Sequence, residues 1–187
     1  MTQITSGNFA FTDTSIKGVK IIDVKRFGDE RGYFMETYKQ PDFIVGGIDA
    51  MFVQDNQSSS KKGVLRGLHF QVTRPQAKLV RVISGEVFDV AVDLRKGSPT
   101  YGKWEAAILR KENRRQFFIP RGFAHGFLVL SDFAEFCYKC DEVYRPEDEA
   151  GLLWSDPDLN ITWPTLDCGF IFSEKDKLNP RLKEFFQ

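Results

Sequence analysis

Apolar and polar residues alternate along much of this chain with a period of two. The clearest run is 86–94, EVFDVAVDL, in which four apolar residues alternate with a second set that includes Asp89 and Asp93. Alternation over eight residues predicts a β-strand. One face of this strand would be apolar and the other would carry two carboxylates. A polar pair on a sheet face is either wet or lines a pocket.

Similar runs recur about every ten residues, the spacing expected of a β-sandwich or barrel. Eighteen phenylalanines, 15 glycines and 8 prolines also favour an all-β, turn-rich fold. Residues 51–63 predict a strand that runs into a Ser/Lys loop. Residues 40–48, QPDFIVGGI, predict one helical turn that a Gly pair stops. The tail, 173–186, holds the strongest helix signals, with Ser173 as a candidate N-cap and Pro180 as an interruption.

The composition narrows the function classes. At 187 residues the chain fits one domain over 1–187. Basic and acidic residues both total 26, so the formal net charge is zero and nucleic acid is not an expected partner. Residues 1–13 lack signal-peptide features, and no apolar run approaches the ~20 residues of a membrane span. Three cysteines, an odd number, fit a reducing cytoplasm, where we expect the protein to work.

Metal chemistry is not expected. Cys137 and Cys140 form a C-x-x-C motif, but they lie in a predicted strand, where an odd separation sends the two side chains to opposite faces. No second such motif or histidine pair accompanies them. A histidine-ligated metal site of this kind would need roughly three histidines and a carboxylate, whereas this chain has two histidines in total.

Each of the two histidines, His69 and His125, adjoins an apolar run. His69 lies on an apolar run between the cationic Arg66 and Lys78, and His125 closes a P-x-G-x-x-H turn that begins at Pro120. Many short strands and a histidine after a Gly turn resemble the cupin arrangement of two antiparallel sheets in a jelly roll. The expected fold is therefore an all-β, cupin-like jelly roll with a few short helices, mainly C-terminal.

Longer motifs make the resemblance specific. They are similar to those of the dTDP-4-dehydrorhamnose 3,5-epimerases, a family of cofactor-free cupin-fold enzymes, and they span nearly the whole chain in order. Small departures include Phe117, which stands where Trp is frequent, and Cys137 before Tyr138. The motifs are DERGYFMETY, VQDNQSSSKKGVLRGLHFQ, KLVRVISGEVFDVAVDLRKGSPTYGKW, FFIPRGFAHGFLVLSD, EVYRPEDEAGLLWSDPDLNITWP and SEKD.

The resemblance implies inversion of C3 and C5 of a dTDP-4-keto-6-deoxyhexose, without cofactor or metal. Both carbons adjoin the ketone, so each proton can leave to form an enolate. That reaction needs a base, a cation for the oxyanion and an acid on the opposite face. The resemblance assigns these roles to His69, to Lys78 and to Tyr138, with Asp176 orienting the imidazole.

Each of these residues also has a purely structural reading. His69 could be a hydrogen-bonded core histidine, Lys78 a surface lysine, and Tyr138 a core aromatic residue. Asp176 lies three residues after Ser173, so it fits the N3 position of a helix cap. From spacing alone the cap is the better explanation of Asp176; the resemblance supports the His-Asp pair.

The resemblance also implies a set of substrate-binding residues and a homodimer. Arginines suit a pyrophosphate because the guanidinium fork meets phosphate oxygens in pairs, and Tyr144 matches a residue that stacks on thymine. The exposed strand 20–27, KIIDVKRF, is compatible with edge pairing between subunits. The implied binding residues are Arg31, Glu36, Gln54, Asp55, Asn56, Arg66, His125, Tyr144, Glu149 and Lys175.

One geometric conflict accompanies this set. Arg66 and His69 are three residues apart, so an ideal strand would face them oppositely. For both to reach one ligand, the strand must bulge or bend at Gly67. Two rival functions stay open: an epimerase or ketoisomerase that acts at a single site on a related dTDP-sugar, and a cupin that binds sugar nucleotides without catalysis.

Overall fold

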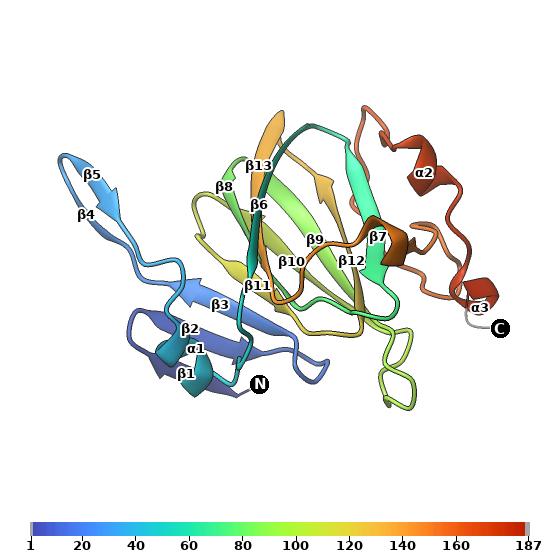
Figure 1. The fold of residues 1–187 in the computed structure, drawn as a ribbon. Coiled ribbons are helices and arrows are strands. Elements are labelled where there is room, and N and C mark those ends of the chain that lie inside the picture. Colours follow the sequence, from blue (N-terminus) through green and yellow to red (C-terminus); the bar gives the residue numbers. More distant parts are fainter. Residues whose placement is uncertain (1, 186–187) are drawn as a thin grey trace.

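The computed structural model describes residues 2–185, and it is built almost entirely from antiparallel strands (Figure 1). The larger sheet has seven strands in the spatial order β1-β2-β3-β11-β8-β13-β6. Their bounds are β1 Gln3–Ser6, β2 Phe9–Asp13, β3 Lys20–Val24, β11 Gln116–Ile119, β8 Lys78–Ser84, β13 Phe133–Cys140 and β6 Gln54–Lys61.

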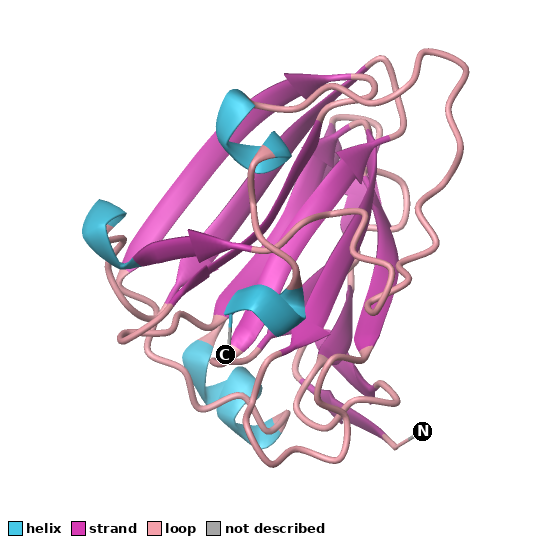
Figure 2. Cartoon of the chain, turned by 90° about the vertical axis from the view of Figure 1, so that its right-hand side faces the viewer, coloured by secondary structure: helices cyan, strands magenta, loops and turns pink. Residues whose placement is uncertain are grey.

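The smaller sheet has five strands in the order β10-β9-β12-β7-β14. It faces the larger sheet, so the two form a cupin-like jelly roll, as predicted (Figure 2). A separate hairpin, β4 with β5, extends away from the body (Figure 1). The bounds are β10 Trp104–Arg110, β9 Glu86–Asp93, β12 Phe123–Val129, β7 Leu65–Gln71, β14 Glu149–Gly151, β4 Phe27–Asp29 and β5 Gly32–Phe34.

The helices are short and lie outside the sheets. They are α1 Gln40–Val45, the 3-10 turn Pro146–Asp148, α2 Glu174–Lys177 and α3 Leu182–Phe185. The expected Ser173 cap, the break around Pro180 and the helical turn at 40–45 are confirmed. Residue 186 of the predicted helical tail lies outside the described residues. No helix within residues 2–185 is long and apolar enough to cross a membrane.

Strand periodicity divides the apolar side chains into three layers. Phe117 and Val80 point between the sheets, into a core that the smaller sheet completes with residues such as Phe127. Their neighbours Phe118 and Leu79 point outward instead, under α1 and the segment that follows it. On the smaller sheet, the outward face is covered by the C-terminal segment.

The strand predicted at 86–94 is confirmed as β9, but its apolar face is the outer one. Val90 and Val92 pack under the C-terminal segment, whereas Ala91 faces the core between the sheets. Asp89 and Asp93 share that inner side, and neither is exposed to solvent. The two carboxylates therefore do not form a solvent-exposed face. Asp89 forms a hydrogen bond with His125, and Asp93 accepts hydrogen bonds from the loop that follows it.

Two sequence interpretations are wrong. The run KIIDVKRF is not an exposed edge, because β3 pairs with β2 on one side and with β11 on the other. The serines expected in a loop belong to β6, which pairs with β13 along its whole length and forms the sheet edge. Apolar alternation identifies a strand but not the strands that pair with it. An edge strand can consist mostly of polar residues, and its sequence then resembles that of a loop.

Candidate active site

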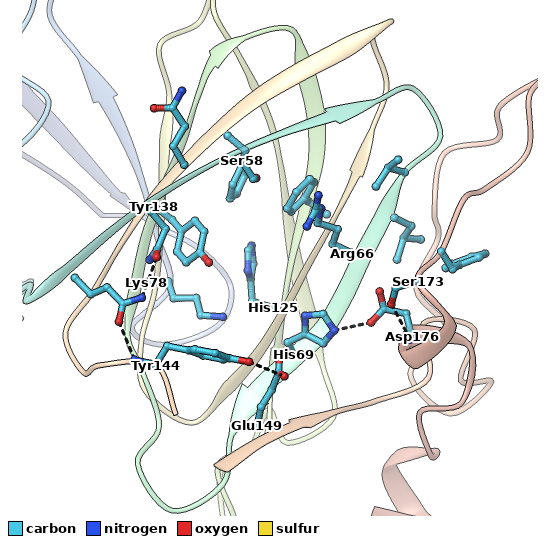
Figure 3. Close-up of a pocket in the computed structure, with 18 of the residues that line it drawn as sticks. Ser58, Arg66, His69, Lys78, His125, Tyr138, Tyr144, Glu149, Ser173 and Asp176 are labelled. Carbon is cyan, nitrogen blue, oxygen red and sulfur yellow. Dashed lines mark hydrogen bonds and ion pairs between the residues drawn. The ribbon is translucent and has the colours of Figure 1, made fainter. Parts of the chain in front are cut away.

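A cavity of about 790 Å³ opens between the two sheets (Figure 3). One wall comes from β6, β8 and β13 of the larger sheet, and the other from β7 and β12 of the smaller sheet. The C-terminal segment closes one side. The lining residues are Gln54, Asp55, Asn56, Gln57, Ser58, Val64, Leu65, Arg66, His69, Lys78, His125, Phe127, Phe136, Tyr138, Tyr144, Glu149, Ile171, Phe172, Ser173 and Asp176.

The bulge expected in β7 is present and brings two of these residues together. Opposite β12, the pairs His69–His125 and Arg66–Phe127 leave three residue steps in β7 against two in β12. Gly67 lies in the bulge with φ of 129°, and a Cβ there would come within 2.5 Å of Gly126 Cα. Only glycine fits this position. As a result, Arg66 and His69 both face the cavity.

His69 is paired with a buried carboxylate. Its Nε2 lies 2.5 Å from Oδ1 of Asp176, whose side chain is only 4% exposed. Burial alone would raise the pKa of Asp176, but hydrogen bonds from His69 and Ser173 outweigh it and lower that pKa. An ionised carboxylate can only accept, so Nε2 carries the hydrogen. When the ring is neutral, Nδ1 is the acceptor, and it lies on the cavity side of the ring (Figure 3).

The cap reading and the His-Asp reading of Asp176 are both satisfied, by different atoms. The backbone N–H of Asp176 donates to Ser173 Oγ at 3.1 Å, while its carboxylate bonds His69. The N-terminal turn of α2 therefore fixes the backbone of Asp176, and the carboxylate is held at the imidazole by a local structure.

Lys78 begins β8 and extends its ammonium into the cavity near His125 (Figure 3). Burial lowers the pKa of Lys78, and the nearby Cys140, Asp89 and Glu149 act in the opposite direction. A cation in so dry a site interacts with a neighbouring negative charge far more strongly than it would in water. The surface reading of Lys78 is therefore wrong.

His125 is buried and forms a second histidine–carboxylate pair. Its Nε2 lies 3.0 and 3.1 Å from the two carboxylate oxygens of Asp89. Burial raises the pKa of Asp89 and lowers the pKa of His125, while their mutual attraction opposes both shifts. Asp89 was not among the expected site residues. The signal for it was present, because alternation placed a carboxylate on one face of that strand.

Tyr138 lies on the wall opposite His69. It belongs to β13 of the larger sheet, whereas His69 belongs to β7 of the smaller sheet, and both line the cavity. Its neighbour Phe136 stacks on Phe127 with ring centroids 4.3 Å apart, which fixes the apolar part of this wall. Burial raises the pKa of Tyr138, so its hydroxyl keeps its proton at neutral pH.

A second group of predicted residues forms the rim of the cavity. Tyr144 donates its hydroxyl to Glu149 at 3.0 Å, and Lys175 forms an ion pair with the same carboxylate. Burial would raise the pKa of Glu149, but the hydrogen bonds from Lys175 and Tyr144 lower it. Asp55 pairs with Lys139 at 2.6 Å, and Gln54 receives the backbone N–H of Tyr144.

Two predicted residues lie away from this cavity. Arg31 is at the tip of the β4–β5 hairpin, where it pairs with Asp29 at 2.6 Å. Glu36 follows the hairpin and accepts a hydrogen bond from Asn8. Neither lines the cavity of its own chain. Sequence motifs indicate what a residue type can bind, but not in which direction a projecting hairpin carries it.

Several residues in the cavity wall or directly behind it were not expected from the sequence. Ser58 lines the wall, and Ser60 accepts from Arg66 Nε at 3.1 Å, which orients that guanidinium. Both lie on the inward face of β6, in the run interpreted as a loop. Ile171 and Phe172 reach the cavity from the C-terminal segment, for which the sequence has no strand or motif signal.

The arrangement combines a hydrogen-bonded imidazole on one wall, a protonated phenol on the other and an ammonium between them. These groups can remove a proton beside a carbonyl, stabilise the enolate oxygen and return a proton to the other face. Arg66 and the rim provide positive charge and an aromatic face for an anionic, base-bearing ligand.

Comparisons with known proteins agree with this geometry. The family model described as dTDP-4-dehydrorhamnose 3,5-epimerase matches residues 13–184. A relative of that description from Methanothermobacter thermautotrophicus is 56% identical over 177 residues, covering 94% of this chain and 96% of the relative. The crystal structure of the Legionella pneumophila dTDP-6-deoxy-D-glucose-3,5-epimerase in complex with dTDP-4-keto-L-rhamnose superposes with a TM-score of 0.91 at 50% identity, covering 94% and 93% of the two chains.

A structure of narrower activity is also similar. A 3'-monoepimerase from Streptomyces bikiniensis, in complex with dTDP-quinovose, superposes with a TM-score of 0.84 at 33% identity, covering 91% of this chain and 86% of that one.

Proposed function

Because the chain belongs to the dTDP-4-dehydrorhamnose 3,5-epimerase family, we propose that it converts dTDP-4-dehydro-6-deoxy-D-glucose into dTDP-4-dehydro-L-rhamnose. The reaction inverts C5 and C3, the two carbons beside the C4 ketone. One observation carries the proposal: His69 and Tyr138 face the same cavity from opposite sheets. Inversion needs a base and an acid on opposite faces of the sugar. A protein that only binds the sugar nucleotide would have no need of such a pair.

The proton movements follow from the hydrogen bonds of the site. Nδ1 of His69 accepts the proton at C5, and the C–H electrons move into the enolate. Asp176 stabilises the imidazolium that results. Lys78 provides positive charge to the C4 oxyanion, and His125 lines the same part of the cavity. Tyr138 then delivers its proton to the opposite face and is left as a phenolate. Once His69 has given its proton to water and Tyr138 has taken one from water, the same sequence is repeated at C3.

Arg66 and the rim residues bind the nucleotide. Arg66 takes pyrophosphate oxygens, with its guanidinium steadied by Ser60. Tyr144 offers its ring to the thymine base, and Glu149, which Tyr144 and Lys175 hold in place, contacts the nucleoside. Gln54, Asp55 and Asn56 occupy the neighbouring part of β6 and contact the sugar or nucleoside.

Arg31 and Glu36 act in the cavity of a second copy. The hairpin that carries Arg31 projects from the body and exposes three aromatic side chains, Phe27, Tyr33 and Phe34. Exposed aromatic residues on a projecting hairpin suit an interface. The enzyme is therefore a homodimer that shares residues between subunits. It works in the cytoplasm, in keeping with the free thiols of its three cysteines.

Complementation tests the shared site. Arg31→Ala and His69→Ala variants should each be inactive alone, and mixing after dissociation should restore about one quarter of the activity, because half of the dimers are mixed and each has one intact site. Failure to regain activity although mixed dimers form would place Arg31 outside the partner's site.

The reaction itself is tested by incubating the protein with dTDP-4-keto-6-deoxyglucose in deuterated water and following C3 and C5 by NMR. Exchange at both carbons, lost in a His69→Ala variant, is the expected result. No exchange at either carbon would refute the proposal and favour a protein that only binds sugar nucleotides.

A single-site epimerase is the second candidate, because the Streptomyces bikiniensis 3'-monoepimerase shares the fold at 33% identity. The same NMR experiment separates the two functions. Exchange and inversion confined to C3 would support the second candidate.

A further inference from the structure

The loop between β13 and the turn at Pro146 has no regular structure, yet its backbone is bonded to glutamine side chains throughout. Gln54 Oε1 accepts from Tyr144 N at 2.8 Å, and Gln76 Nε2 donates to Glu142 O at 2.7 Å. Gln71 bonds the residues on either side of Tyr144. We call Gln54, Gln71 and Gln76 the glutamine clasp.

Gln71 is the central member of the clasp. Its Oε1 accepts from Arg145 N at 2.7 Å, and its Nε2 donates to Val143 O at 3.4 Å and to Arg74 O at 2.7 Å. The residue is 4% exposed and lies at the end of β7, directly opposite Glu149 in the sheet. One buried amide thus joins the strand that carries His69 to the loop that carries Tyr144.

We propose that Gln71 is a positioning residue for nucleotide recognition, which holds the Tyr144 ring as a preformed platform for the base. The inference rests on the proposed function, in which Tyr144 stacks on thymine. Gln71 acts through Tyr144 and not by touching the ligand, because its amide oxygen and both amide hydrogens are engaged by the two loops.

The physical reason is preorganisation. Tyr144 is 47% exposed, so little packing fixes its ring. The only side-chain bond that its hydroxyl makes within residues 2–185 is to Glu149. With the flanking backbone anchored, the loop loses little conformational entropy when a base stacks on it. Without the anchor, that entropy would be lost at each binding event, and nucleoside affinity would fall.

Gln71→Leu tests this inference, because it keeps the bulk and removes all three hydrogen bonds. The dissociation constants of dTDP and of inorganic pyrophosphate are measured by calorimetry. We expect dTDP to bind about tenfold more weakly and pyrophosphate to bind within twofold of the parent protein. Turnover at saturating substrate should change little, so the effect falls on KM and not on kcat.

Two matched controls separate positioning from a general loss of stability. Gln116→Leu removes another buried glutamine, 1% exposed and bonded to Thr37 O, which does not line the cavity. It should lower the melting temperature without changing dTDP affinity. Gln71→Met removes the same three hydrogen bonds with an unbranched side chain, and it should show the same loss of dTDP affinity if the Leu variant folds poorly.

A double-mutant cycle with Tyr144→Ala is the decisive comparison. If Gln71 acts through Tyr144, Gln71→Leu should not weaken dTDP binding further once the ring is gone. An equal loss in both backgrounds, or an equal loss for pyrophosphate, would overturn the inference. If Tyr144→Ala alone leaves dTDP affinity unchanged, the base platform itself is wrong, and that failure is distinct from a failure of Gln71.

Discussion

Removing the charge of Asp176 should slow the enzyme without unfolding it. Asp176→Asn keeps the size of the side chain and the backbone N–H that donates to Ser173, so α2 should remain capped. It removes the carboxylate that lies 2.5 Å from His69 Nε2. The neutral amide no longer stabilises the imidazolium that forms when His69 takes a proton from the sugar.

The size of the effect follows from the burial of the pair. A hydrogen bond to a charged group contributes about 1.5–3 kcal/mol, and solvent screens this one little because the Asp176 carboxylate is 4% exposed. Each 1.36 kcal/mol is tenfold in rate, so kcat should fall about 10- to 150-fold.

The assay is the initial rate of deuterium entry at C5, measured from pH 5 to 9. Asp156→Asn is the matched control: Asp156 is also buried, but its carboxylate accepts from the backbone of Leu182 and Asp158, outside the cavity. It should lower stability and leave the rate per folded enzyme unchanged. An Asp176→Asn enzyme with the parent rate would show that Asp176 only caps α2.

Three further changes test the fold around the site. Lys78→Met should abolish activity yet raise the free energy of unfolding at pH 7, because burial of the ammonium lowers the pKa of Lys78 and the apolar side chain removes that cost. This increase in the free energy of unfolding should shrink as the pH approaches 10.5. A Lys78→Met variant that is less stable than the parent at pH 7 would contradict the prediction. Burial would raise the pKa of Asp93, but hydrogen bonds from residues 95–100 outweigh it and hold that pKa well below its usual range. The ionised Asp93 carboxylate therefore stabilises the fold above about pH 4, and this stabilisation is lost on acidification. Asp93→Asn should cost about 2 kcal/mol in urea unfolding at neutral pH, and the difference from the parent should narrow below pH 4; a constant difference would refute the assignment. Gly67→Ala should cost more than about 3 kcal/mol, because φ is positive and Gly126 Cα lies in the way. Its control, Gly97→Ala, has φ of 80° in open space and should cost about 1 kcal/mol in the same urea unfolding.

Local features of the chain were predictable. Alternation predicted β9, the Gly pair ended α1, and Ser173 capped α2, because each depends on a few neighbouring residues. The bulge at Gly67 was also predictable, since two residues three apart had to face one ligand.

The long-range arrangement of the strands was not predictable from the sequence. Alternation does not specify which strands pair, so β3 was expected at an edge although it lies inside the sheet. It does not specify which face is covered either, and the apolar face of β9 turned out to lie under the C-terminal segment. The partner of Asp89 and the direction of the hairpin that carries Arg31 depend on tertiary packing and on assembly.

The central claim is that a proton leaves toward His69 on one wall and returns from Tyr138 on the other. Deuterium exchange and configuration at C5, followed together by NMR for the parent enzyme and for Tyr138→Phe, test it most directly. The parent should give inverted, deuterated product, and Tyr138→Phe should exchange the C5 proton with retention, since only His69 can then return a deuteron. Inverted product formed by Tyr138→Phe at the parent rate would contradict the account.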